Sequence, residues 1–380
     1  MSPNPMVGAA LEWPDGRREV AYYRRFGGPH AEAQLLSRQT GRLPRGVRLY
    51  VTLEPCSVVG KTPACVEAIL RARPGRVIVS CLDPDPRVAG RGIAQLRAEG
   101  IAVELGAGAN LSLALNHGFH LAHRRGRALV RLKIASSLDG KLATQSGESQ
   151  WITSPESRRE VHRERASADA VVVGAGTLAA DDPELTVRHL RGPEPSKIVI
   201  DSTLRTDPRA RIWRSARAAG WIEAETAERR TGNFLGTEVA GGVRWIRRPR
   251  LIVATLSSVS AERIAERRRD GWEVWTLPSD RTGRVSLKAF SRRAARAGLH
   301  RLLVEAGPTL AGALLAERLV DELSLYLGPL VLGGDRSWSA GFAAAALARA
   351  PQFELVKQRR IGADCWIEFR RRDWSEGLAL

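Results

Sequence analysis

Short apolar runs alternate with helical segments along most of this chain, and that alternation restricts the fold more than any other feature of the sequence. Residues 76–83, RVIVSCLD, are almost continuously apolar, as in a strand that is buried on both faces of a sheet. The sequence predicts a helix before this strand, over 62–73, which Thr62 and Pro63 would open. A second helix is expected after it, over 89–100. We therefore predict an α/β fold with mostly parallel sheets.

The alternation stops and restarts near Gly126, which predicts more than one domain in a chain of 380 residues. We place the boundary there, after a helical stretch, so that residues 1–125 form one domain and residues 126–380 the other. Residues 205–250 turn polar and rich in Arg, Gly and Thr, and we interpret them as an irregular surface insertion in the second domain.

The second domain repeats the order of strand and helix. Residues 154–167 are expected to form a helix, with Ser154 as its N-cap and Pro155 in its first position. Strands are expected at 128–137, 169–174, 196–201, 250–255, 272–277 and 301–306, and as a pair near 353–371.

Composition excludes several classes of protein. Hydrophobic residues make up 43% of the chain and charged residues 26%, which is ordinary for a globular protein and argues against disorder. The apolar runs are too short for a membrane span and no leader opens the sequence, so we expect a cytoplasmic protein with no membrane partner. The net charge of +18 is interleaved with acids and suits anionic small substrates; we predict no nucleic-acid partner. Four cysteines in a cytoplasmic chain argue against disulfides.

Two of the cysteines belong to a pattern that is typical of a catalytic zinc site. The segment GGPHAE places His30 and Glu32 two residues apart, just before a helical pattern. Cys56 follows the strand expected at 47–55, and Cys65 lies in the first turn of the next helix. One imidazole and two thiolates bind zinc and leave a fourth position open for water. A glutamate beside them moves protons between that water and a leaving amine, as in zinc deaminases.

The motifs SPNPMVGA, GGPHAE, YVTLEPCS, GKTPAC and DPDPRVAGRGIAQL resemble the bifunctional deaminase–reductase family of riboflavin biosynthesis. The resemblance implies a cytidine-deaminase-like first domain that hydrolyses the 2-amino group of a diamino-ribosylamino-pyrimidinone 5′-phosphate. His30, Cys56 and Cys65 would then bind Zn²⁺, and Glu32 would be the catalytic proton shuttle. The substrate-binding residues that the resemblance implies here are Asn4, Lys61 and Thr62.

In the second half of the chain, turns rich in glycine or hydroxyl groups follow three expected strands. Residues 132–153 form a strand and then a loop with many hydroxyl groups. Residues 172–188 contain a buried strand, a glycine turn and a polar segment. Residues 304–315 form a strand, a glycine turn and a helix, and a helix N-terminus of this kind binds phosphate readily. None of these turns has the pattern G-x-G-x-x-G, so a Rossmann dinucleotide site is not predicted.

These three segments resemble the reductase domain of the same family, which implies a dihydrofolate-reductase-like fold and NADPH as cofactor. The residues implied to bind NADPH are Ala135, Trp151, Thr177, Asp181, Ser202, Gly307, Pro308, Thr309, Leu310, Ala311, Gly312 and Ala313. Those implied to bind the substrate are Ser149, Arg165, Leu185, Arg188 and Glu305. Arg165 and Arg188 are suitable guanidinium partners for a phosphate. The implied reaction is hydride transfer to the first ribose carbon, in a homo-oligomer that forms through the second domain.

Three other interpretations stay open. Val58 and Asp85 stand where the family has His and Asn, and the chain starts almost on the SPNP motif. With its short start and Val58, such a chain would keep only the reductase, with a weakened deaminase domain. A nucleic-acid-editing deaminase would explain the +18 charge, but not the long loop between the cysteines or the complete second half. A paralogue would act on a related pyrimidine or pterin.

Overall fold

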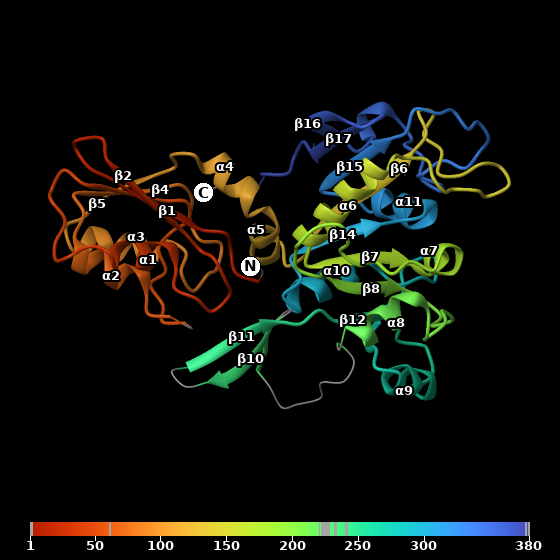
Figure 1. Cartoon of the computed structure of the whole chain (residues 1–380), viewed down its shortest axis with the longest axis horizontal. Coiled ribbons are helices and arrows are strands. Elements are labelled where there is room, and N and C mark those ends of the chain that lie inside the picture. Colours follow the sequence, from red (N-terminus) through yellow and green to blue (C-terminus); the bar gives the residue numbers. More distant parts are fainter. Residues whose placement is uncertain are drawn as a thin grey trace. The chain divides into compact units, whose positions relative to one another are not determined.

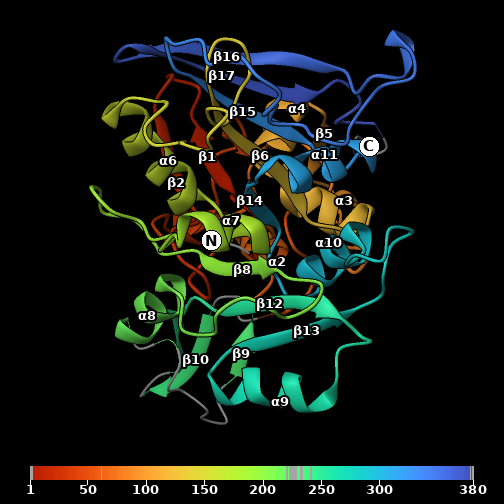
Figure 2. The same ribbon diagram turned by 90° about the vertical axis from the view of Figure 1, so that its right-hand side faces the viewer.

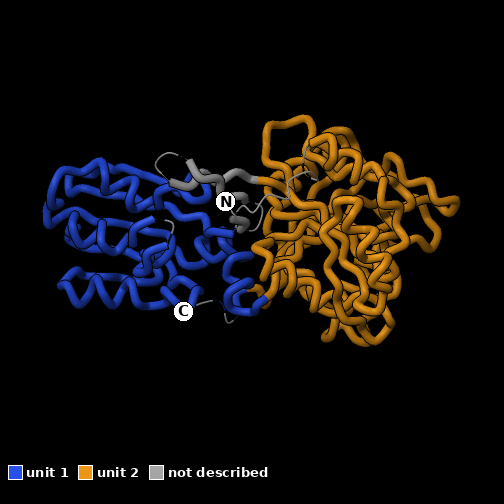
Figure 3. Tube along the Cα trace, turned by 90° about the horizontal axis from the view of Figure 1, so that it is seen from below, with its two compact units in different colours: residues 1–126, 237–245, 375–380 blue, residues 127–236, 246–374 orange. Residues whose placement is uncertain are grey.

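The computed structural model describes residues 3–60, 62–219, 221, 229–231, 234–239, 242–376 and 378. The chain divides into two compact units, which Figure 3 distinguishes by colour: residues 1–126 with 237–245 and 375–380, and residues 127–236 with 246–374. The main division therefore falls between Gly126 and Arg127. Among the described residues, no helix has the length and apolar character that crossing a membrane requires.

The first unit is built on a five-stranded sheet with the order β2-β1-β3-β4-β5 (Figure 1). Its strands are β1 (Gly8–Glu12), β2 (Arg18–Tyr22), β3 (Arg48–Val51), β4 (Arg76–Val79) and β5 (Ala102–Leu105). Its helices are α1 (Ala31–Leu36), α2 (Cys65–Ala72), α3 (Arg91–Ala98), α4 (Ala109–Leu115) and α5 (His117–Arg124). β1 is antiparallel to β2 and β3, whereas β3, β4 and β5 are parallel, so that their carboxyl ends share one edge.

The hydrophobic core of this unit lies between the sheet and the helices α1, α2 and α3. Leu35, Ile69 and Leu96 of these helices are fully buried together with Leu11 and Leu49 of the sheet. Burying a side chain of this size contributes about 1.5–3 kcal/mol. The core therefore fixes the first turns of α1 and α2 relative to the end of β3.

Helix α2 begins at Cys65, so the prediction that Thr62 and Pro63 open it is wrong. The backbone N–H of Cys65 donates to the sulfur of Cys56 at 3.3 Å, and the N–H of Val66 donates to the carbonyl of Cys56 at 3.2 Å. A helix N-terminus needs acceptors for its free N–H groups. Here they come from the chain after β3, a partner distant in sequence, and not from the hydroxyl of Thr62.

The second unit contains a nine-stranded sheet with the order β13-β12-β8-β7-β14-β6-β15-β17-β16, seen in Figure 2 from β13 near the bottom to β16 at the top. Neighbours from β13 to β15 are parallel, and β17 and β16 continue the sheet as antiparallel strands. Its strands are β6 (Leu129–Ser136), β7 (Ala170–Gly174), β8 (Ser196–Ile200), β12 (Leu251–Leu256), β13 (Glu273–Leu277), β14 (Arg301–Glu305), β15 (Glu322–Leu327), β16 (Phe353–Ile361) and β17 (Asp364–Arg371).

Helices cover both faces of this sheet. They are α6 (Pro155–Ser167), α7 (Ala175–Asp181), α8 (Arg211–Ala218), α9 (Ala261–Arg269), α10 (Leu287–Arg296) and α11 (Pro308–Ala316), with a 3₁₀ turn at Leu347–Arg349. Val253 of β12 packs in one core with Ile212 of α8 and Ile264 of α9. On the other face, the ring of Trp275 lies 6.1 Å from that of Phe290 in α10. The predicted α/β fold is confirmed.

The start of α6 is also as predicted. Ser154 is the N-cap, its side chain accepts the N–H of Ser157, and Pro155 occupies the first turn. Capping signals of this kind are local in sequence, because a side chain binds an N–H group only a few residues away. They are therefore visible before the fold is known.

Residues 205–250 were predicted to be irregular, and this prediction is wrong for part of the segment. They contain α8 and three strands, β9 (Arg229–Thr231), β10 (Phe234–Val239) and β11 (Gly242–Arg247), which form a small sheet with the order β11-β10-β9. In α8, Ile212 and Ala216 are fully buried, while four of its eight residues are Arg or Ser. Trp213 packs against the same core, so α8 has an apolar face that the polar residues around it made easy to overlook.

A buried ion pair connects the start of β6 to the start of β15. Arg127 donates to both oxygens of Asp321, at 2.7 and 2.6 Å, and Asp321 also accepts the N–H of Val130 at 3.0 Å. The side chain of Asp321 is only 2% exposed and that of Arg127 13%. Removing one partner of such a pair leaves the other charge buried without compensation.

We expect Asp321→Ala to lower the free energy of unfolding by about 3–5 kcal/mol, because Arg127 stays buried and unpaired. Glu156→Ala is the matched control: it removes the ion pair with Arg159, whose side chains are 44% and 54% exposed, and should cost less than about 1 kcal/mol. Urea unfolding of the full chain measures both. Equal losses in the two variants would contradict the role assigned to the buried pair.

Candidate functional site

The candidate metal site of the first unit lies where α1, α2 and the chain after β3 meet. His30 directly precedes α1, Cys56 follows β3, and Cys65 is the first residue of α2. One ligand atom from each lies within 4.8 Å of the others. The Nδ1 atom of His30 is 3.2 Å from the sulfur of Cys65 and 3.6 Å from that of Cys56. An imidazole and two thiolates at these separations form a donor set that fits Zn²⁺.

The two cysteines differ in acidity. The pKa of Cys56 is lowered from 9.0 to about 4, because Cys65 and His30 donate hydrogen bonds to its sulfur. The pKa of Cys65 is raised, because this thiol donates one of those bonds and is buried. The contact with Cys56 also raises the pKa of His30. The cluster thus holds a thiolate at neutral pH, which is the form that binds metal ions.

Glu32 lies in the first turn of α1 and is 3% exposed. Its Oε2 atom is buried and has no hydrogen-bond partner among the described residues. Burial raises the pKa of this carboxyl group, because the charged form loses its hydration. A buried carboxyl group with a free oxygen, two residues from His30, is suited to taking up and releasing a proton.

A second buried carboxylate, Glu54, fixes the chain just before Cys56. Its oxygens accept four backbone N–H groups, at 2.8 to 3.3 Å, from Asp83, Gly90, Gly92 and Ile93. A Cβ atom on Gly92 would lie 2.1 Å from the carbonyl oxygen of Pro55, so only glycine lets α3 approach this closely. Glu54 belongs to the motif YVTLEPCS, but nothing in the sequence pattern assigned it a role.

Asn4 is tied to the segment that carries His30. Its Nδ2 donates to the hydroxyl oxygen of Tyr23 at 3.1 Å, and the N–H of Gly27 donates to the same oxygen at 3.0 Å. Tyr23 is 2% exposed, and its ring lies edge-on to the imidazole of His30 at 5.6 Å between centroids. No motif spacing pointed to Tyr23. Thr62 lies just before α2, and the predicted substrate residue Lys61 lies outside the described residues.

The second candidate site lies at the carboxyl ends of the parallel strands of the second unit. Arg165 of α6 forms a bidentate ion pair with Glu305 at the end of β14, with N–O distances of 2.6 and 2.9 Å. The Nζ atom of Lys133 in β6 is 3.9 Å from Glu305. Burial alone would raise the pKa of Glu305, but Arg165 and Lys133 hold it at about 2. The site is therefore a buried, ionised carboxylate between two cations.

The glycine turn before α11 contacts the first turn of α7 at the same edge of the sheet. The hydroxyl oxygen of Thr177 accepts the N–H of Gly307 at 3.1 Å. A Cβ atom on Gly312 would lie 2.1 Å from the carbonyl oxygen of Ala340, so this glycine allows α11 to contact that loop. The predicted cofactor residues Thr177 and 307–313 are thus brought together at a helix N-terminus, where backbone N–H groups suit phosphate.

Comparison with known proteins decides the family. A model described as the RibD C-terminal domain matches residues 128–367. The chain is 35% identical to the riboflavin biosynthesis protein RibD of Escherichia coli (strain K12) over 378 residues, which cover 95% of this chain and 92% of that protein. It is 32% identical to RibD of Aquifex aeolicus (strain VF5), with 97% and 93% covered. The chain belongs to the RibD family. The resemblance seen in the sequence motifs is confirmed.

Solved structures agree with this membership in the RibD family. A structure of Acinetobacter baumannii RibD matches with a TM-score of 0.78 at 31% identity, covering 97% of this chain and 93% of that one. A Thermotoga maritima protein, described as a diaminohydroxyphosphoribosylaminopyrimidine deaminase/5-amino-6-(5-phosphoribosylamino)uracil reductase, matches with a TM-score of 0.76 at 26% identity and the same coverage. Both units are therefore those of RibD proteins.

Four other predicted residues of the RibD-like second unit have varied surroundings. Trp151 is 66% exposed, with the guanidinium of Arg158 4.2 Å from its ring. Leu185 is 2% exposed and packs in the core, so that only its backbone can meet a substrate. The half-exposed Arg188 pairs with Glu184 at 2.9 Å. The hydroxyl oxygen of Ser202 accepts the backbone N–H of Val285, just before α10, at 3.0 Å.

The remaining assignments stay predictions. Ala135 lies in β6 and packs beside the buried Tyr326. Asp181 ends α7, where burial raises the pKa of its carboxyl group and Lys133 opposes the rise. Ser149 lies in the loop after β6 and is partly exposed. Lys133 itself was missed, because a lysine within a strand has no spacing signal.

We expect Arg165→Met to cost more stability at pH 7 than at pH 3. In the wild type the pKa of Glu305 is about 2 instead of 4.5, which stabilises the fold above pH 4.5 by roughly 3 kcal/mol. This contribution disappears as the pH falls toward 2. Without the guanidinium, burial raises the same pKa, so that ionisation of Glu305 then opposes folding as the pH rises.

Urea unfolding at pH values from 3 to 7 measures this difference. Arg159→Met is the control on the same helix, because Arg159 pairs only with the exposed Glu156 among the described residues. The gap between wild type and Arg165→Met should widen with pH, and that of the control should stay flat. A gap that is constant with pH would refute the electrostatic coupling.

Proposed function

We propose that this RibD family protein is bifunctional. The first unit would use Zn²⁺ to deaminate 2,5-diamino-6-ribosylamino-4(3H)-pyrimidinone 5′-phosphate hydrolytically, and the second would use NADPH to reduce the ribosyl side chain to ribityl. The cluster of His30, Cys56 and Cys65 beside the buried Glu32 carries the proposal. The description of the Thermotoga maritima relative supports both reactions. A chain with only the reductase is less well supported, because the three candidate zinc ligands and Glu32 are all present.

In the deaminase, His30, Cys56 and Cys65 would hold Zn²⁺ through one nitrogen and two sulfurs. Bound zinc supplies hydroxide at neutral pH, because it lowers the pKa of water to about 7. Glu32 would take up at its free Oε2 the proton that the attacking water loses and deliver it to the amino group, which leaves as ammonia. Asn4, which Tyr23 fixes beside His30, contacts the pyrimidine.

In the reductase, NADPH carries the hydride, and the protein supplies position and charge. The turn at Thr177 and Gly307 and the N-terminus of α11 provide N–H groups for the cofactor's phosphates. Glu305, which Arg165 and Lys133 keep ionised, accepts hydrogen bonds from hydroxyl groups of the ribosyl chain. The guanidinium of Arg188 is half exposed and suits the 5′-phosphate. Assembly as a homo-oligomer is part of the same proposal.

We expect Cys56→Ser to lose the bound zinc, because a hydroxyl group replaces the thiolate ligand. Cys365→Ser is the matched control, since this free cysteine lies in β17 of the other unit. Zinc per chain, measured by elemental analysis after dialysis, should be about one in the wild type and the control and close to none in the Cys56 variant. Equal zinc in all three proteins would rule out the three-ligand site.

We expect Glu32→Gln to lower the rate of ammonia release by about 10²–10⁴-fold, because the amide cannot carry the proton. Reduction of the already deaminated substrate should be unchanged, since Glu32 belongs to the other unit. Ammonia release and NADPH oxidation are measured on the same preparation. If both activities fall together, the two sites are not independent.

A further inference from the structure

Residues 184–188 of the second unit, called here the substrate arm, adopt an unusual backbone. Leu185 has a φ of 53°, and the flanking residues Asp182 and His189 have φ values of 38° and 65°. Side chains other than glycine rarely adopt this region, and such residues persist where the surrounding structure holds them. Strain of this kind concentrates at functional sites. The arm carries Arg188, the guanidinium assigned above to the substrate phosphate.

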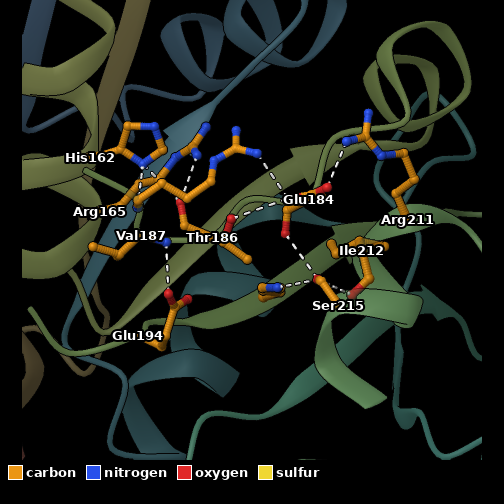
Figure 4. Close-up of polar contacts among 11 residues, drawn as sticks. His162, Arg165, Glu184, Thr186, Val187, Glu194, Arg211, Ile212 and Ser215 are labelled. Atoms are coloured by element: carbon orange, nitrogen blue, oxygen red, sulfur yellow. Dashed lines mark hydrogen bonds and ion pairs between the residues drawn. The ribbon is translucent and has the colours of Figure 1, made fainter. Parts of the chain in front are cut away.

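Side chains from outside hold the arm at three backbone positions, as Figure 4 shows. The carbonyl oxygen of Thr186 accepts an N–H of Arg165 at 3.0 Å. The N–H of Val187 donates to Glu194 at 2.8 Å. The N–H of Arg188 donates to the Nδ1 atom of His162 in α6 at 3.0 Å. Backbone that is fixed at three successive residues sets the direction in which the side chain of Arg188 leaves it.

Only the neutral tautomer of His162 that carries its proton on Nε2 can hold Arg188. Its Nδ1 atom lies 3.0 Å from the N–H of Arg188 and 2.9 Å from the carbonyl oxygen of Thr186, and it accepts from the first only when it carries no proton. In this tautomer the oxygen of Thr186 has the N–H of Arg165 as its donor. His162 is 6% exposed, and burial together with Arg165 lowers its pKa to about 4. The ring is therefore neutral at neutral pH.

The charged groups around this ring keep it neutral. Arg165 lies on the same helix, Arg188 belongs to the arm and His189 directly follows it, and all three oppose a positive charge on His162. The ring of His189 packs edge-on at 5.4 Å between centroids. The ionised Glu305 of β14 is the acidic group that acts in the opposite direction. A neutral ring with its proton on Nε2 has a lone pair on Nδ1, and the N–H of Arg188 points at that atom at 3.0 Å.

We propose that His162 is a positioning residue of the reductase, which holds the substrate arm so that Arg188 faces the substrate's phosphate. This inference rests on the proposed function of the second unit. His162 would act through Arg188 and would not touch the substrate, so its effect should appear in the KM of the phosphorylated substrate and not in that of NADPH. Nothing in the spacing of the sequence motifs pointed to His162.

The test compares His162→Gln with His162→Asn in the full-length, zinc-loaded protein. The amide oxygen of Asn comes close to the place of Nδ1 and can accept the N–H of Arg188, whereas the amide of Gln reaches the place of Nε2. We expect the Gln variant to raise the substrate KM about three- to tenfold, as for one lost neutral hydrogen bond. The Asn variant should stay within about twofold of the wild type. The KM of NADPH should not change in either.

A double-mutant cycle with Arg188→Ala then separates positioning from a merely structural role. Arg188→Ala alone should raise the substrate KM by about one to two decades, because a charge-assisted hydrogen bond is lost. If His162 acts through Arg188, His162→Gln should add nothing on that background. His162→Leu, which also lacks an acceptor, replaces the Gln variant if the latter does not fold. Ammonia release by the first unit reports that each preparation is intact.

Three results would overturn the inference. They are an unchanged substrate KM in the Gln and Leu variants, an Asn variant no better than the Gln variant, or equal rises in the KM of substrate and NADPH. A wild-type protein that does not reduce the deaminated substrate at all would instead refute the proposed function. The two failures are therefore distinguishable on one set of proteins.

Discussion

The buried ion pair between Arg165 and Glu305 organises the whole edge of the sheet in the second unit. It joins α6 to the end of β14 through two short hydrogen bonds, and a third N–H of the same guanidinium reaches the substrate arm at Thr186. A lysine could not make these three contacts at once, because its ammonium group lacks the planar fork of a guanidinium. Because the pair fixes α6, it also fixes His162, which lies one turn away on that helix.

In the first unit a buried carboxylate also holds the loops of the site, but backbone N–H groups bind it in place of a guanidinium. Glu54 collects four backbone N–H groups from the loop after β4 and the start of α3. A buried carboxylate is tolerated there because hydrogen bonds replace its hydration. Cys56 lies two residues after Glu54, so these hydrogen bonds also hold the segment that supplies the thiolate. In both units, then, a buried carboxylate at the end of a strand holds the loops that carry the chemistry.

The sequence predicted those features that depend on local signals. Ser154 and Pro155 mark the start of α6 because a cap acts over a few residues. His30, Cys56 and Cys65 were found from residue type and from their places beside a strand and two helices, and the structure brings them together. The start of α2 was missed because its N–H groups are satisfied by Cys56, nine residues away.

Tyr23 and His162 were missed for a related reason. A buried tyrosine and a buried histidine occur in many cores, and their importance here comes from single hydrogen bonds to Asn4 and to the backbone of Arg188. Such partners are set by tertiary packing, which a one-dimensional pattern does not contain. The helix α8 has an apolar face of Ile212, Trp213 and Ala216, but it was missed because its other residues are mostly Arg and Ser and the segment was interpreted by its polarity.

Several arginines of this chain form ion pairs inside the fold. Arg131, 16% exposed, lies among Glu164, Glu322 and Glu368, and Arg250, 9% exposed, pairs with Glu273. These guanidinium groups and their carboxylates already cancel in the net charge, so the excess of +18 belongs to the other basic residues. The charge available to an anionic substrate depends instead on which arginines the carboxylates leave accessible. Arg188 is one of these: it shares Glu184 with Arg211, and half of its side chain stays open to solvent.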